Sequence, residues 1–349
     1  SRVNDKAVGN SGGITIDTST LTLEKGGLIS ASTSGKGNAG KIEIQATEGV
    51  TVGGALNSRV NDTGDGNSGG ITIDTSTLTI ENTGIISANT SGKGNAGNIA
   101  IKSTERVTVR GRLTSRVNDT AVGNSGGITI DTSTLTLKNG GRITASTFGQ
   151  GNAGNIAIKA TQGVNVNIGG LLSSGVTATG EGNSGGITID TSTLTLEKGG
   201  FIDASKSGKG NAGDIAIKAT QGVTVGGFLT SGVFDTGEGN SGGITIDTST
   251  LTLENDGYIN ASTFGKGNAG DINIKARNIT IDQSGVDSST VGDSARKGGN
   301  ININTSNLTL KNGYIATETG GKGDAGNIQV NITALTTFGT GIDGRIIQI

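Results

Sequence analysis

Side chains that could do chemistry are sparse in this sequence, and most of them recur at fixed intervals. The 349 residues include no histidine and no cysteine, and 29 acidic residues nearly balance 27 basic ones. An enzyme that cleaves glycans needs a unique cluster of carboxylates, often with Arg, Lys or His beside it. Here the acidic residues return in register, as Asp17, Asp74 and Asp131 do. This repetition is typical of a structural ladder, so we predict no enzymatic activity, no catalytic residue and no cofactor.

One acidic, glycine-rich segment is similar to a calcium-binding loop. Residues 61–66 read Asn-Asp-Thr-Gly-Asp-Gly, but Thr72 stands at the twelfth position, where such a loop has a Glu. The matching segments of the first and third repeats replace the acidic centre with Lys6-Ala7-Val8 and Thr120-Ala121-Val122. A solvated loop explains this pattern better than a specific calcium site. We therefore predict no metal site.

The elements that must position these side chains follow from an internal repeat of 57 residues. Copies of one segment, three strong and three weak, begin at Ser1, Ser58, Ser115, Ser174, Ser231 and Ser288, and one interval is 59 residues. Each unit holds two finer repeats, which place Ile14, Ile42 and Ile71 at equivalent positions. A chain of near-copies forms one array of a single structural element. We predict one body over residues 1–349 that belongs to a longer protein.

The finer repeat predicts strands and no helix. Residues 14–17, 21–23 and 28–31 alternate apolar and polar side chains, and period-2 alternation marks a strand with one buried face. Gly, Asn, Ser and Thr, which favour turns, lie between these stretches. If the three strands wind as one coil, each strand can pair in parallel with the equivalent strand of the next coil. Crossover connections between parallel strands are right-handed in almost all cases. We predict an all-β, right-handed parallel β-helix of three sheets, with about 12 coils of 28–29 residues and two coils per 57-residue repeat.

Columns of equivalent residues should run along this rod. The inward-facing aliphatic residues of the first two coils are Ile14, Ile16, Leu21, Leu23, Ile29, Ile42, Ile44, Val50, Val52 and Leu56. A structural ladder of corner asparagines is predicted at Asn10, Asn38, Asn67, Asn95, Asn124, Asn152, Asn183, Asn211, Asn240 and Asn268. On the outer surface, acidic and basic residues should alternate as Asp74, Lys102, Asp131, Lys159, Asp190, Lys218, Asp247 and Lys275.

One column does not fit a purely solvated rod. The outward position of the third strand is occupied by Phe201, Phe228 and Tyr258 in three consecutive coils, and later by Tyr314. Contiguous exposed apolar surface usually marks an interaction site. We predict that this strip packs against another rod or stacks on sugar rings, unless neighbouring loops cover it.

Composition excludes several other functions. A net charge of −2 gives no basic footprint for nucleic acid or for an anionic membrane. No run of 18 apolar residues that could span a membrane occurs.

Two motifs carry a family resemblance. Residues 94–99 (Gly-Asn-Ala-Gly-Asn-Ile) and 141–147 (Gly-Arg-Ile-Thr-Ala-Ser-Thr) resemble the repeats of cyanobacterial haemagglutinin-like surface proteins, which are similar to the filamentous haemagglutinins exported by two-partner secretion. The resemblance implies a secreted β-helix stalk and an outer-membrane secretion partner. The secretion domain of that family carries Asn-Pro motifs, and this chain has no proline, so we expect that domain to be absent from it.

These observations predict a non-catalytic, extracellular stalk or fibre of a repetitive surface adhesin. Its expected partners are further copies of the rod, joined end to end or laterally, or glycans of a host or matrix. Two alternatives stay open at this point: the subunit of a homopolymeric extracellular filament, and a secreted β-helix that binds or processes carbohydrate.

Overall fold

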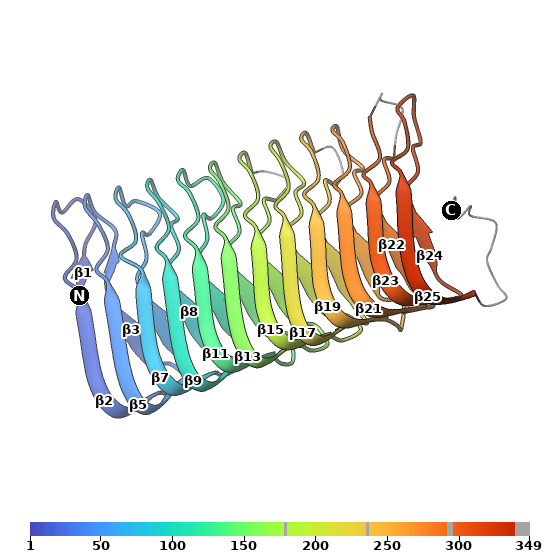
Figure 1. Ribbon diagram of the computed structural model, residues 1–349. Helices are drawn as coiled ribbons and strands as arrows, with labels where there is room; N and C mark the ends of the chain where they lie inside the picture. Colours follow the sequence, from blue (N-terminus) through green and yellow to red (C-terminus); the bar gives the residue numbers. More distant parts are fainter. Residues whose placement is uncertain (178–179, 235–236, 292–295, 339–349) are drawn as a thin grey trace.

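The chain winds into a single elongated solenoid. The computed structural model describes residues 1–177, 180–234, 237–291 and 296–338 (Figure 1). Parallel sheets form a β-solenoid of about 11 turns, with about 29 residues per turn and three sheets. Among the described residues, no helix qualifies as a membrane span. The predicted all-β parallel architecture is confirmed.

Two kinds of strand alternate along the chain. The long strands form one 12-stranded sheet in chain order: β2 (Ile14–Leu23), β5 (Ile42–Val52), β7 (Ile71–Ile80), β9 (Ile99–Val109), β11 (Ile128–Leu137), β13 (Ile156–Val166), β15 (Ile187–Leu196), β17 (Ile215–Val225), β19 (Ile244–Leu253), β21 (Ile272–Asp282), β23 (Ile301–Lys311) and β25 (Ile328–Phe338). The short strands form an 11-stranded sheet: β3 (Leu28–Ser30), β6 (Ala55–Asn57), β8 (Ile85–Ser87), β10 (Arg112–Thr114), β12 (Arg142–Thr144), β14 (Leu171–Ser173), β16 (Phe201–Asp203), β18 (Phe228–Thr230), β20 (Tyr258–Asn260), β22 (Gly285–Asp287) and β24 (Tyr314–Ala316).

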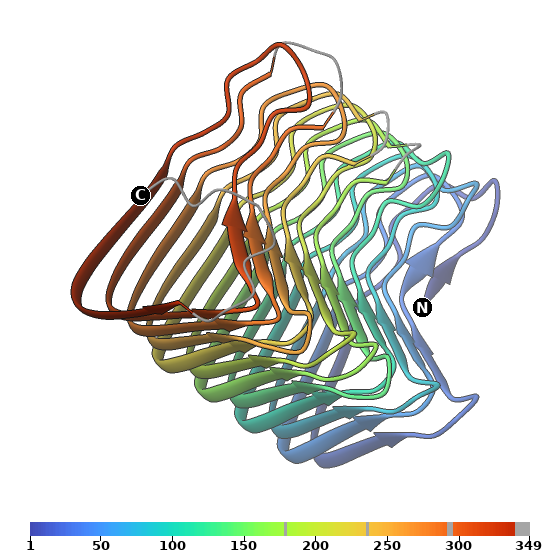
Figure 2. The same cartoon turned by 90° about the vertical axis from the view of Figure 1, so that its right-hand side faces the viewer.

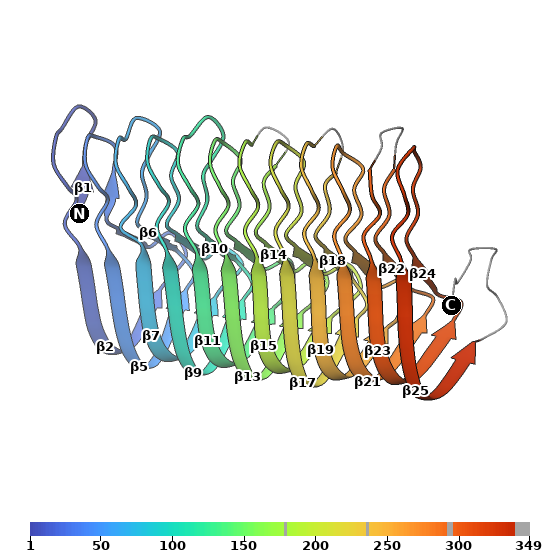
Figure 3. The same ribbon diagram turned by 45° about the horizontal axis from the view of Figure 1, so that its top comes forward.

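The third side of each turn is less regular. Strands β1 (Arg2–Val3) and β4 (Ser32–Thr33) pair there, and later turns continue this side as single bridges such as that between Thr33 and Val60. Beyond this side the chain projects outward as loops, which form a row along one edge of the rod (Figure 3).

The structure differs from the sequence prediction at the first corner. Residues 14–17 and 21–23 belong to one strand, β2, which bends so that it forms two sides of the cross-section (Figure 2). The register against β5 shifts between Thr18 and Thr20, and most of the long-strand pairs show the same shift. An extra residue in one strand of a pair bends it locally. A bulge accompanies the bend in most pairs, whereas the β19–β21 and β21–β23 pairs pass the corner without a register shift.

Aliphatic side chains fill the interior of every turn. The predicted inward residues of the second coil are at most 1% exposed, and those of the first coil pack against the end of the core while partly buried. Burial of one such side chain contributes roughly 1.5–3 kcal/mol. This continuous core holds the rod together.

The corner asparagines form the predicted ladder. The backbone N–H of Asn38 donates to Oδ1 of Asn10 over 2.8 Å, and this bond recurs at 2.8–2.9 Å up to Asn268. Gly37, which precedes Asn38, has a φ of 134°, and a Cβ there would lie 2.2 Å from the carbonyl oxygen of Gly9. Only glycine allows the close approach of successive corners that the ladder requires.

Acidic and basic residues alternate along the outer surface as predicted, but few neighbouring pairs are close enough to form an ion pair. Lys159 is the strand partner of both Asp131 and Asp190. Within the described part of the chain, however, the Lys275–Asp247 pair is the only member of this column within 4.0 Å, at 3.9 Å. The column thus acts through longer-range attraction between exposed charges, which is weak.

Candidate functional site

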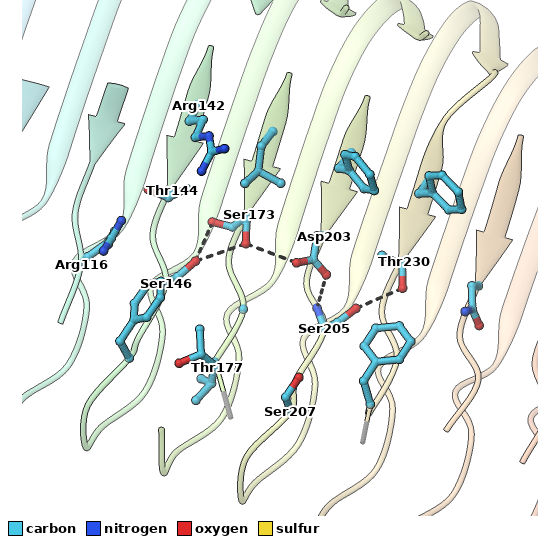
Figure 4. A pocket seen from close by; sticks show the side chains of 18 of the residues that line it. Arg116, Arg142, Thr144, Ser146, Ser173, Thr177, Asp203, Ser205, Ser207 and Thr230 are labelled. Carbon is cyan, nitrogen blue, oxygen red and sulfur yellow. Dashed lines mark hydrogen bonds between the residues drawn. The ribbon is translucent and has the colours of Figure 1, made fainter. Parts of the chain in front are cut away.

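A groove runs along the rod between the short strands and the loops that follow them. Its cavity volume is about 710 Å³, and its lining residues come from six consecutive short strands, β10 to β20, and from the adjoining loop segments (Figure 4). Each short strand is only three residues long. The chain then turns outward into the loops, and a concave surface between strand and loop recurs in these six turns. Stacked turns convert this local concavity into a groove.

The predicted aromatic strip forms one wall of this groove. Strand register places Arg112, Arg142, Leu171, Phe201, Phe228 and Tyr258 in one column along the rod. Phe201 and Phe228 are 39% and 40% exposed, so the strip is neither fully covered nor fully solvated. Tyr258 is half-buried, and its hydroxyl donates to Oδ2 of Asp287 over 2.7 Å. Burial and the nearby Asp287 carboxylate raise the pKa of Tyr258.

The rings of the strip are stacked with an offset. The centroids of Phe201 and Phe228 are 5.2 Å apart, and the ring planes differ by 10°. This separation exceeds the contact distance of two flat rings, so each ring leaves part of its face uncovered. Tyr258 is turned nearly perpendicular to Phe228, at 6.5 Å and 85°. The wall therefore presents both faces and edges to the groove.

The opposite wall is also aromatic, and it was not predicted from the sequence. Phe148, Phe234 and Phe264 lie on the loops, and the last two are stacked with centroids 5.6 Å apart. Each directly follows a residue in the column of bridges that includes Thr147, Val176, Lys206, Val233 and Thr263. Aligning the repeats at the residue after that column would have revealed the three phenylalanines. Five of the six phenylalanines of the chain, together with Tyr258, line this one groove.

The floor of the groove is polar and internally hydrogen-bonded. Ser146 and Ser173 share a hydrogen bond of 3.2 Å, and the Ser173 hydroxyl donates to Oδ2 of Asp203 over 3.4 Å (Figure 4). The backbone N–H of Ser205 donates to Oδ1 of Asp203 over 2.9 Å, and the Ser205 and Thr230 hydroxyls lie 3.1 Å apart. Burial raises the pKa of Asp203, although the bonds from Ser205 and Ser173 oppose the shift. Hydroxyls and one carboxylate thus face the aromatic walls.

The charged groups of the groove are unevenly distributed. Arg112, Arg116 and Arg142 line one end, whereas Asp203 is the single acidic residue among the described lining residues. Glycosidases use a pair of carboxylates, and this lining offers one. Among the described residues, no three Asp or Glu side chains gather where they could hold a metal ion. The groove thus combines exposed aromatic rings with hydroxyl groups, three arginines and one carboxylate.

Tyr314 and the asparagine ladder lie apart from this groove. Tyr314 continues the strip towards the C-terminal end, where it lines a neighbouring cavity with Phe228 and Tyr258. The ladder asparagines are not among the groove-lining residues.

Comparison with known proteins adds no further assignment. No protein-family model, no curated protein and no solved structure matches this chain.

Proposed function

We propose that this chain is the non-catalytic rod of a secreted surface adhesin and that it binds an extended glycan in its groove. One observation carries the proposal: both walls of a groove parallel to the rod axis are aromatic, and its floor is lined with hydroxyl groups. The proposal joins two possibilities that the sequence left separate, the stalk and the carbohydrate-binding β-helix.

The chemistry of the groove suits a sugar. A pyranose has an apolar C–H face and a rim of hydroxyls, and aromatic rings beside hydrogen-bonding groups match these two surfaces. Equivalent positions recur in every turn, roughly 4.8 Å apart. A polymer lying along the axis can therefore contact one residue of the strip column at each step, from Arg112 to Tyr258. A compact ligand would use only part of such a groove.

A binding role fits the groove better than a catalytic one. Asp203 has Ser205 and Ser173 as its hydrogen-bond partners, and the lining residues that the structure describes include no second carboxylate that could act with it. The continuous aliphatic core supports the stalk part of the proposal, because it extends through the described turns as one cluster. The secreted location rests on the resemblance of the repeats to haemagglutinin-like surface proteins.

Affinity electrophoresis in gels that contain a polysaccharide tests the binding role. The triple substitution Phe201→Ser, Phe228→Ser and Tyr258→Ser should abolish retardation while the β-sheet circular dichroism spectrum persists. Ile168→Ser is the matched control, because Ile168 is 67% exposed and does not line the groove. Retardation that survives the triple substitution contradicts the glycan proposal. Loss of a dimer in light scattering, with no glycan effect, would instead assign the strip to lateral packing of rods.

Immunogold labelling of the source cells tests the stalk role. Label along thin projecting fibres supports a surface stalk. Label found only in the medium, on compact particles, contradicts it and leaves a secreted glycan-binding protein.

A further inference from the structure

We propose that the glycan is anionic and that its charged groups bind to Arg112, Arg116 and Arg142 at one end of the groove. This inference rests on the proposed function, and it names the class of glycan. The ligand carries a carboxylate or a sulfate group on a sugar, and both of these groups bind guanidinium groups.

Two of these arginines face each other on neighbouring strands. Arg112 of β10 and Arg142 of β12 are direct strand partners, and both side chains are exposed. Like charges at directly opposite positions destabilise a sheet. Within the described part of the chain, none of the ion pairs within 4.0 Å includes either residue. The repulsion between the two guanidinium groups is therefore not relieved by a carboxylate in contact with them.

Arg116 adds a third positive charge from the groove floor. Its Cζ lies 4.3 Å from the ring centroid of Phe148, which holds the guanidinium group in place. Its Nε is buried and has no hydrogen-bond partner among the described residues. Burial lowers the pKa of Arg116, the positive charge of Arg112 lowers it further, and Asp119 opposes the shift. This guanidinium group is thus partly desolvated and incompletely neutralised.

A neighbouring hydroxyl is also available. Thr144 lies two residues after Arg142 on β12, lines the same groove and is 7% exposed. Its Oγ1 has no hydrogen-bond partner among the described residues. Buried polar groups normally have partners. A hydroxyl-rich ligand that enters between the walls would supply one after a small rotation of this side chain.

The distribution of charge determines which part of the groove receives the charged units of the ligand. Guanidinium groups bind carboxylate and sulfate oxygens through parallel N–H donors. The other end of the groove offers rings and Asp203, whose carboxylate repels an anion. An acidic glycan therefore places its charged units at the arginines and its apolar faces against Phe201 and Phe228.

Isothermal titration calorimetry of the full chain tests this inference with three polymers. Polygalacturonate presents carboxylates, dextran sulfate presents sulfates, and unmodified dextran is neutral. We expect one or both acidic polymers to bind at least about tenfold more tightly than dextran in about 50 mM NaCl, and to lose that advantage in about 500 mM NaCl. The arm that binds more tightly identifies the anionic group.

Matched variants test whether the groove arginines bind the anionic groups of the polymer. The double substitution Arg112→Gln and Arg142→Gln should reduce acidic-polymer binding to the level of dextran. The control Arg106→Gln and Arg277→Gln removes two exposed arginines outside the groove and should leave binding unchanged. Equal binding of all three polymers, unaffected by the groove substitutions, overturns this inference while the proposed function stands. Binding of none of the polymers contradicts the inference and counts against the proposed function as well.

Discussion

The rings of Tyr258 and Tyr314 are in contact although two turns separate their strands. Their centroids lie 6.4 Å apart, whereas two strand spacings amount to roughly 9.6 Å. The strand between them, β22, has Gly285 at the equivalent position, and a Cβ there would lie 2.5 Å from Cζ of Tyr314. The ring of Tyr314 thus covers the glycine and extends the strip across the gap.

Gly285→Ala should therefore displace the Tyr314 ring. The lost contact with Tyr258 should cost about 0.5–1.5 kcal/mol of stability. Tyrosine fluorescence and urea unfolding measure the two effects. Gly222→Ala is the control, because the nearest atom to its Cβ would lie 3.7 Å away. If Gly285→Ala leaves both signals at their wild-type values, Gly285 does not make room for the ring.

Asn152→Ala should destabilise the rod through one lost hydrogen bond. Asn152 Oδ1 accepts the backbone N–H of Asn183 at 2.8 Å, and the substitution removes that acceptor. We expect a loss of about 0.5–1.5 kcal/mol in urea unfolding. Hydrogen exchange should accelerate at the Asn183 amide in particular. Asn152→Asp keeps an oxygen at this position and should restore most of the protection; equal loss in both variants would contradict the acceptor role.

The repeat made most of the fold predictable. Ile and Leu at alternating positions identify the inward face, and equivalent positions such as Ile14 and Ile42 fix the strand register. The bend of β2 was not predictable in the same way, because Thr18, Ser19 and Thr20 interrupt the alternation just as a turn would. The structure shows that one strand, Ile14–Leu23, continues through the corner.

Of the two aromatic walls of the groove, one was predicted from the sequence. Phe201, Phe228 and Tyr258 stand at a strand position whose outward direction follows from period 2. Phe148 and Phe234 stand six residues after Arg142 and Phe228, so the same period of two, continued past the end of the short strand, gives their direction. The sequence analysis ended this alternation with the short strand, because glycine and polar residues follow it as they would in a turn.

Lys206 is a buried cation whose removal should stabilise the protein. It is 1% exposed, its Nζ has no hydrogen-bond partner among the described residues, and its bridge partners are Val176 and Val233. Burial lowers the pKa of Lys206 to about 8 from 10.5, and Glu181 opposes the shift. Below pH 8 both states carry the proton, so the cost of burying the charge is fully present. Between about pH 8 and 10.5 only the unfolded state keeps it, so stability rises with pH.

Lys206→Thr should therefore gain on the order of 3 kcal/mol at pH 7, and the gain should shrink as the pH approaches 10.5. Urea unfolding of both proteins at pH 7 and pH 10 measures this difference. Lys218→Thr, at an exposed position, is the control. If the two proteins differ in unfolding free energy by the same amount at pH 7 and pH 10, the charge of Lys206 does not affect stability.

Reversing one charge of the surface column should have a small, salt-sensitive effect. Lys159→Asp places a carboxylate between Asp131 and Asp190, and like charges on neighbouring strands repel. We expect a loss of a few tenths of a kcal/mol to about 1 kcal/mol at low salt, which should disappear in about 1 M NaCl. Lys159→Gln separates loss of attraction from new repulsion. A loss that persists in high salt would point to a packing defect.

The most direct test of the glycan-binding groove is the dependence of affinity on ligand length. The groove spans six strands, β10 to β20, or roughly 24 Å at one strand spacing per turn. Calorimetry with oligogalacturonates of increasing length that keep free carboxylates at one end and are methyl-esterified, and so neutral, beyond it should show affinity that rises until the oligosaccharide matches this span and then levels off. Affinity that does not depend on length, or no binding at any length, would contradict the assignment of this groove to an extended acidic glycan.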